Sequence, residues 1–67
     1  SYPPEKLVPT MVKELAKLNP QGHVHAQELY AAFNTIKRIS PSQVVHLLEN
    51  NSDIEHLGDL YYRIKLK

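Results

Sequence analysis

Cationic side chains suited to binding occur in two short stretches of the sequence. Lys37-Arg38 forms the first stretch, and Tyr61, Arg63 and Lys65 alternate along the second. Lysine and arginine neutralise phosphates, and an aromatic ring set among cations can stack on a base. The two stretches therefore predict contacts with a nucleic acid. The alternative for the second stretch is a basic edge strand that discourages aggregation.

A predicted helix after Ser40 adds a polar face to these cations. Its outward residues are Ser42, Gln43, His46, Glu49 and Asn50. Glutamine, asparagine, serine and histidine contact bases or phosphates, whereas Glu49 would repel phosphate. The alternative is an ordinary solvated helix face. The resulting candidate nucleic-acid-binding residues are Lys37, Arg38, Gln43, His46, Tyr61, Arg63 and Lys65.

The sequence contains no motif for catalysis or for metal binding. It has 4 histidines, no cysteine and 2 glycines. There is no His-x-x-x-His pair, no nucleophile elbow and no glycine-rich phosphate loop. Asp53 and Glu55 share a predicted strand face, where we expect them to neutralise Arg63 or Lys65 across a hairpin. We therefore expect a protein that is not an enzyme and that holds no cofactor and no metal.

The length and the net charge of the chain limit the functions that it can have. The 67 residues carry 8 Lys and Arg against 7 Asp and Glu, so the net charge of +1 permits nucleic-acid binding without arguing for it. No apolar run approaches the roughly 18 residues of a membrane span, and no signal peptide opens the chain. We expect residues 1–67 to form one monomeric domain, excised from a longer protein, that acts in the cytoplasm or nucleus and contacts no membrane.

The first half of the chain predicts two helices separated by a short strand. Residues 5–18 place their apolar side chains in one stripe, and Pro9 requires either a kink or a regular helix that begins there. Asn19-Pro20-Gln21-Gly22 stops this helix and turns the chain. His23-Val24-His25 is short and could form an isolated strand segment, and residues 26–33 are expected to form the second helix.

The second half predicts a third helix and a hairpin. Ser40 is the N-cap of that helix, Pro41 its first residue and Gln43 the partner in a capping box. Asn50-Asn51-Ser52 can end the helix, because asparagine tolerates left-handed geometry. The two strands of the hairpin, joined by the turn Gly58-Asp59, are residues 53–57 and 60–66.

The order helix, short strand, helix, helix, hairpin predicts an α+β fold, a small winged helix-turn-helix whose wing is the C-terminal hairpin. Leu60, Tyr62, Ile64 and Leu66 are expected to share one face of the last strand. The residues predicted to be largely buried together are Leu15, Val24, Leu29, Phe33, Val45, Leu48, Ile54, Tyr62 and Ile64.

The chain resembles the La motif, the winged-helix RNA-binding domain of La and La-related proteins. The matching residues are Gly22-His23-Val24, Leu29, the run Phe33-Asn34-Thr35-Ile36-Lys37-Arg38-Ile39-Ser40, Val45, Leu48, Ser52-Asp53-Ile54-Glu55 and Tyr62-Arg63-Ile64. The resemblance implies RNA binding. The glutamine, paired tyrosines and aspartate-x-phenylalanine with which that family reads RNA 3′ ends are absent from Tyr2-Pro3-Pro4-Glu5-Lys6-Leu7, so only Phe33 is carried over as a pocket residue.

The chain is also similar to the LOTUS domain in its length, its early Pro-x-Gly turn and its hairpin. That likeness implies association with RNA or with DEAD-box helicases.

Two functions follow from these patterns. In the first, RNA or another nucleic acid binds one continuous strip from Lys37-Arg38 over Gln43 and His46 to the hairpin. In the second, the domain binds a protein partner within a larger regulatory or RNA-processing complex. The partner would then use the outer side of the first helix and the stiff lead-in at Tyr2 and Pro3-Pro4.

Overall fold

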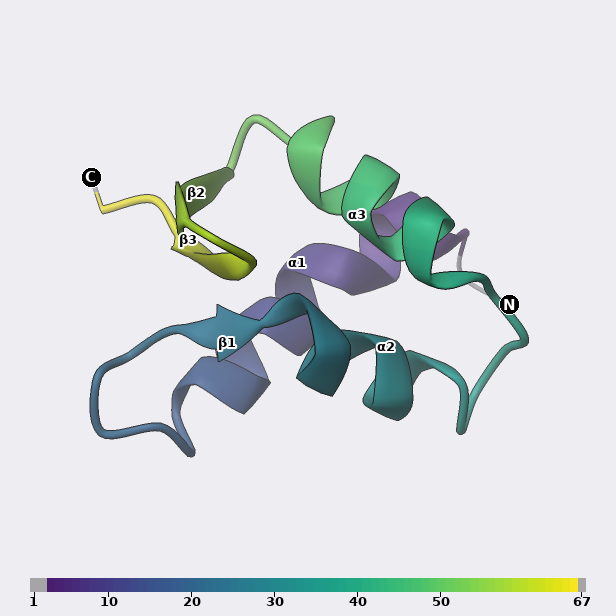
Figure 1. Cartoon of the computed structure of the whole chain (residues 1–67), viewed down its shortest axis with the longest axis horizontal. Coiled ribbons are helices and arrows are strands. Elements are labelled where there is room, and N and C mark those ends of the chain that lie inside the picture. The colour runs from purple at the N-terminus through teal and green to yellow at the C-terminus, as the bar shows by residue number, and fades with distance from the viewer. Residues whose placement is uncertain (1–2, 67) are drawn as a thin grey trace.

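A computed structural model describes residues 3–66, which form three helices and a three-stranded antiparallel sheet (Figure 1). This arrangement confirms the predicted α+β class. The domain measures 28 × 22 × 21 Å, with α1 behind α2 and α3 in Figure 1 and the hairpin β2–β3 at one end of the long axis. The elements in chain order are α1 (Pro4–Ala16), β1 (Val24–His25), α2 (Ala26–Phe33), α3 (Pro41–Glu49), β2 (Ile54–Gly58) and β3 (Tyr61–Ile64).

Helices α2 and α3 begin with the same capping device. The Ser40 hydroxyl accepts a hydrogen bond from the Gln43 N–H (3.2 Å), and the Gln43 side chain accepts one from the Ser40 N–H (3.0 Å). This confirms the predicted capping box. At α2 the N-cap is His25, whose ring Nδ1 accepts a hydrogen bond from the Gln27 N–H. The Glu28 side chain in turn accepts a hydrogen bond from the His25 N–H. Sequence patterns missed this second box, because histidine is not a usual N-cap residue.

Helix α1 differs from its predicted bounds at both ends. It begins at Pro4 with Pro3 as its N-cap, so Pro4 belongs to the helix and not to a stiff lead-in. Pro9 lies inside the helix and does not start its regular part. The helix stops at Ala16, and Leu18, which was assigned to its apolar stripe, is 82% exposed.

The sheet has the strand order β1-β3-β2. β1 is therefore not isolated, because Val24 pairs with Tyr62 and His25 pairs with Tyr61. The hairpin turn also lies one residue later than predicted: Gly58 pairs with Tyr61 after an irregularity in β2. Leu60 stays in the turn, where its carbonyl accepts a hydrogen bond of 2.8 Å from the Ala26 N–H at the start of α2.

The end of α3 corrects another prediction. Asn50 caps the helix at φ −100°, so no left-handed asparagine is used. Its side-chain amide donates to the His46 carbonyl (2.8 Å), which satisfies an acceptor that the last turn leaves unpaired. In the described residues a positive φ outside glycine occurs only at Asp59, in the hairpin turn.

The core lies where the three helices meet the inner face of the sheet. Six of the predicted core residues are buried, and Leu15, Val45 and Ile64 are partly buried around them. Leu60 and Leu66 are 43% and 80% exposed, so the predicted apolar face of the last strand is confined to Tyr62 and Ile64. The fully buried side chains are Val8, Val12, Val24, Leu29, Phe33, Val44, Leu48 and Tyr62.

Candidate nucleic-acid interface

The connection between α2 and α3 is a built loop that presents Lys37 and Arg38. The Phe33 carbonyl accepts hydrogen bonds from the Ile36 N–H (3.0 Å) and the Lys37 N–H (2.9 Å). The Asn34 amide donates to the Ile39 carbonyl (3.3 Å) at the far side of the loop. Asn34 thus spans the loop and fixes the backbone from which the two cations project. Sequence reasoning noted Asn34 only as part of a family-like run.

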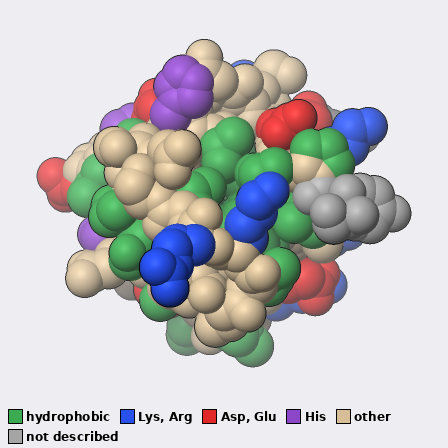
Figure 2. Space-filling model, turned by 90° about the vertical axis from the view of Figure 1, so that its right-hand side faces the viewer, with side chains coloured by type: hydrophobic (Ala, Val, Ile, Leu, Met, Phe, Trp, Pro, Cys, Tyr) green, Lys and Arg blue, Asp and Glu red, His purple; other side chains and the backbone are tan. Residues whose placement is uncertain are grey.

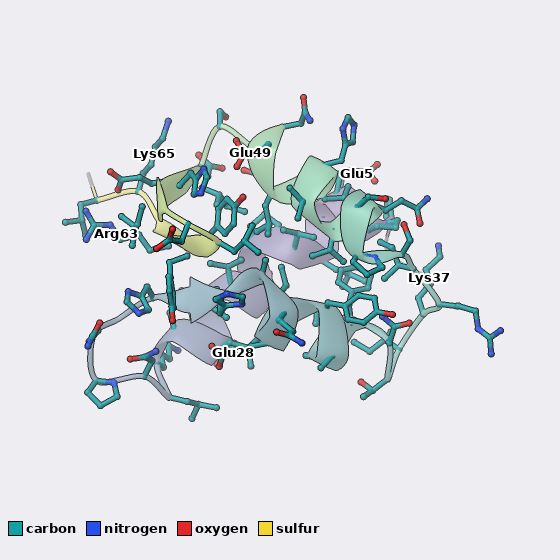
Figure 3. All side chains as sticks on the ribbon, viewed as in Figure 1. Glu5, Glu28, Lys37, Glu49, Arg63 and Lys65 are labelled. Atoms are coloured by element: carbon teal, nitrogen blue, oxygen red, sulfur yellow. The ribbon has the colours of Figure 1, made fainter. Side chains whose placement is uncertain are left out.

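Lys37 and Arg38 are exposed, and neither forms an ion pair within residues 3–66. Among residues 3–66, the ion pairs are those of Lys17, His56 and Arg63, so no carboxylate lies within 4.0 Å of either loop cation. The first turn of α3, which follows directly, contains no acidic residue. Figure 2 views the end of the molecule where Figure 3 places Lys37, and Lys and Arg side chains lie near its middle while acidic side chains lie nearer its margin.

The polar face of α3 is exposed as predicted, but its groups are partly engaged. The side-chain oxygen of Gln43 serves the capping box, so its amide NH₂ is the part that a ligand would meet. The Nδ1 atom of His46 lies 3.2 Å from the Asn50 amide, which leaves the Nε2 side of the ring for a ligand. Both residues stand on the first two turns of α3. With Lys37 and Arg38 they are called the loop group below.

The remaining candidates, Tyr61, Arg63 and Lys65, are called the hairpin group. The Arg63 Nε donates to Glu55 Oε1 across the hairpin at 2.9 Å, as the sequence predicts for this pair. The Tyr61 ring is 36% exposed and contacts the rings of His23 and His25, with centroid distances of 4.5 and 4.9 Å.

The structure separates the two groups. Figure 3 shows Lys37 at one end of the long axis and Arg63 and Lys65 at the other. The hairpin lies beside the C-terminal end of α3 whereas the loop precedes its N-terminal end, so the predicted continuous strip would have to run along the whole exposed face of α3. Phe33, carried over as a pocket residue from the La motif, is fully buried and cannot contact a ligand.

A polar cluster that sequence reasoning missed joins α3 to the hairpin. Glu49 Oε2 accepts a hydrogen bond from the Tyr62 hydroxyl (2.6 Å) and lies 3.0 Å from His56 Nδ1. The His56 ring stacks on Tyr62, and its Nε2 contacts the Asp59 carbonyl. Burial of the Tyr62 hydroxyl, its hydrogen bond to Glu49 and the charge of Glu49 together raise the pKa of Tyr62 to about 12.

No group of three or more His, Cys, Asp or Glu side chains in residues 3–66 is arranged to hold a metal ion. No helix in this range is long and apolar enough to cross a membrane. Tyr2, expected to contribute to a protein-binding surface, lies outside the described residues.

Comparison with known proteins adds no relative to this picture. No family model, no curated protein and no solved structure matches the chain. The resemblance to the La motif stays a prediction from the residues that carry it.

Proposed function

We propose that the chain is a winged helix that binds nucleic acid, with RNA as the preferred ligand, through the loop group. The element order, with the hairpin following the third helix and the strand order β1-β3-β2, supports the winged-helix class. In such folds the third helix commonly faces the ligand. The preference for RNA rests on the La-like residues between Phe33 and Ser40.

The observation that carries the proposal is the pair of uncommitted cations beside the start of α3. Lys37 and Arg38 project from a loop held by Asn34, and no carboxylate of residues 3–66 lies within 4.0 Å of either cation. A phosphate at this place would meet two cations and the positive end of a helix whose first turn is free of acidic residues.

The residues of the loop group contact different parts of the nucleic acid. Lys37 and Arg38 hold the phosphate backbone, and the Gln43 amide and the His46 ring lie along α3, where they meet bases. The hairpin group is a secondary contact, because Arg63 already pairs with Glu55 and only Lys65 of its two cations is without an ion pair among residues 3–66. With few free cations the affinity should be weak, in the micromolar range, and should fall steeply as salt is added.

An NMR titration of the domain with single-stranded RNA at low salt tests the proposal. Amide shifts should concentrate in residues 35–46, and Lys37→Ala with Arg38→Ala should reduce them strongly at the same RNA concentration. Gln21→Ala, an exposed change in the turn after α1, is the control and should leave the shifts intact. Shifts confined to α1, or no shifts at all, would reject the loop group as the binding surface.

A second candidate function is docking of a protein on α1. A groove of about 340 Å³ lies between α1 and the end of β3, with Pro9, Lys13 and the largely exposed Leu66 in its wall. This surface overlaps the outer side of α1 expected for a protein partner. Apolar docking of this kind would keep its affinity as salt rises, whereas phosphate binding would not.

A further inference from the structure

A second groove lies between the first two turns of α2 and the first two turns of α3. It encloses about 250 Å³, and its apolar wall comes from Ala26, Tyr30, Pro41, Val45 and Leu60. Leu60 belongs to the hairpin turn, which the bond from the Ala26 N–H to its carbonyl ties to α2. Three elements therefore shape this groove, and none of its walls depends on residues outside the described range.

Polar groups complete the groove. Gln27 is exposed on α2 and offers both an amide donor and an amide acceptor. His25 also lines the groove, and its Nδ1 accepts a hydrogen bond of 3.0 Å from the Gln27 N–H. The neutral ring must then carry its proton on Nε2, so His25 presents a fixed donor. An apolar pocket with a few fixed polar groups is typical of a site for a small flat ligand.

Charge near the groove comes from residues just outside its lining, among them Glu28, whose carboxylate accepts a hydrogen bond from the His25 N–H. The lining of the groove contains no Asp or Glu, and its Pro41 side follows Arg38 by three residues. A ligand that places a ring in the groove can therefore place a phosphate near Lys37 and Arg38. On the other side, the His25 ring contacts Tyr61 at 4.9 Å, so the surface continues toward the hairpin group.

We propose that this groove takes one unpaired base of a single-stranded RNA whose phosphates lie over Lys37 and Arg38, an inference that rests on the proposed function. A base inside a duplex is stacked on both faces and paired at its edge, so it cannot enter an apolar groove without being flipped out. A docked protein helix would call for a longer apolar face, whereas this groove is short and has hydrogen-bonding groups in its lining.

Fluorescence anisotropy with one labelled RNA, free and annealed to its complement, tests the inference. The single strand should bind about tenfold more tightly than the duplex. Tyr30→Leu should weaken single-strand binding about tenfold, which is at the lower end of what the loss of one stacked base costs. Gln27→Ala, an exposed change that spares the fold, should weaken it a few-fold. Gln21→Ala is the matched control and should bind as the unmodified protein does.

The outcomes separate the inference from the proposed function. Equal affinity for both RNA forms, with the groove variants unaffected and Lys37→Ala weakened, would overturn the groove inference and leave the proposed function standing. Binding of neither RNA at low salt would overturn the proposed function. In that case a titration with nucleoside 5′-monophosphates decides the groove alone: shifts at Ala26, Val45 and Leu60 support it, and their absence rejects it.

Discussion

The two ends of this domain use similar residue types in opposite ways. At the hairpin end, Arg63 is paired with Glu55 and the Tyr61 ring packs against His23 and His25. At the loop end, the cations Lys37 and Arg38 have no carboxylate within ion-pair distance among the described residues. The difference teaches that a cation in the sequence indicates a binding surface only when the fold gives it no other partner.

The polar groups that hold the loop end are neutral, and this explains the contrast. Asn34 bridges the loop with its amide, and Ser40 and Gln43 close the start of α3 with a hydroxyl and an amide. No charged side chain takes part in these bonds, so the charges of Lys37 and Arg38 stay available. At the hairpin end, Glu55 neutralises Arg63 across the two strands, and Glu49 joins α3 to the hairpin through Tyr62 and His56.

The largest expected effect comes from the core beneath the loop. Phe33 is fully buried at the end of α2, and its carbonyl holds the first turn of the loop. Phe33→Ala should lower the free energy of unfolding by about 3–5 kcal/mol, much of the stability of so small a domain. Denaturant unfolding measures it, with the exposed Ile36→Ala as control. An unchanged midpoint for Phe33→Ala would show that the helix faces are misassigned.

The next largest effect is a loss of stability at alkaline pH, which Tyr62 causes at the hairpin end. The pKa of Tyr62 is about 12 in the fold and 10.0 in an exposed tyrosine. Because the pKa is higher in the folded state, the neutral Tyr62 hydroxyl stabilises the fold. This contribution to the free energy of unfolding is fully present below pH 10 and is lost as pH rises toward 12. The loss should reach about 2–3 kcal/mol. Tyr62→Phe should show a smaller alkaline loss than the unmodified protein.

The control for that measurement is Tyr61→Phe, because Tyr61 is exposed on the other face of β3. It should unfold across the alkaline range as the unmodified protein does. An alkaline loss of the same size in Tyr62→Phe would mean that burial and the contact with Glu49 do not raise the pKa of Tyr62 in solution.

Much of this fold was predictable from local sequence signals. Ser40, Pro41 and Gln43 specify the start of α3 by themselves, and the apolar spacing of α2 fixed its buried side. The errors arose where distant residues decide the outcome. The turn moved because the Leu60 carbonyl meets Ala26, and β1 joined the sheet because Tyr61 and Tyr62 pair with it.

The candidate site was predictable in its residue types and not in its geometry. Exposure of Lys37 and Arg38 follows from their place in a polar connection. Their separation from the hairpin depends on how α3 spans the domain, which no local pattern reveals. The cluster of Glu49, Tyr62 and His56 was missed because its members lie on α3 and two strands, although a glutamate on the helix face was noted.

A smaller effect is expected from a substitution that makes the hairpin end resemble the loop end. Glu55→Gln removes the partner of Arg63 and frees its charge. We expect RNA affinity to rise a few-fold, while stability falls by less than about 1 kcal/mol, as is usual for exposed ion pairs. Glu14→Gln makes the same charge change in the Lys17 pair on α1 and serves as control. An equal gain in both variants would mean that net charge matters and position does not.

The central claim is that the loop cations, and not the hairpin cations, hold the phosphates. The salt dependence of RNA affinity tests it most directly, in two double variants that each remove two positive charges. Replacing Lys37 and Arg38 by alanine should reduce the slope of log affinity against log salt by about 1.4, two phosphate contacts on a single strand. Replacing Arg63 and Lys65 should change it by less than half as much. A larger change in the second variant than in the first would contradict the claim.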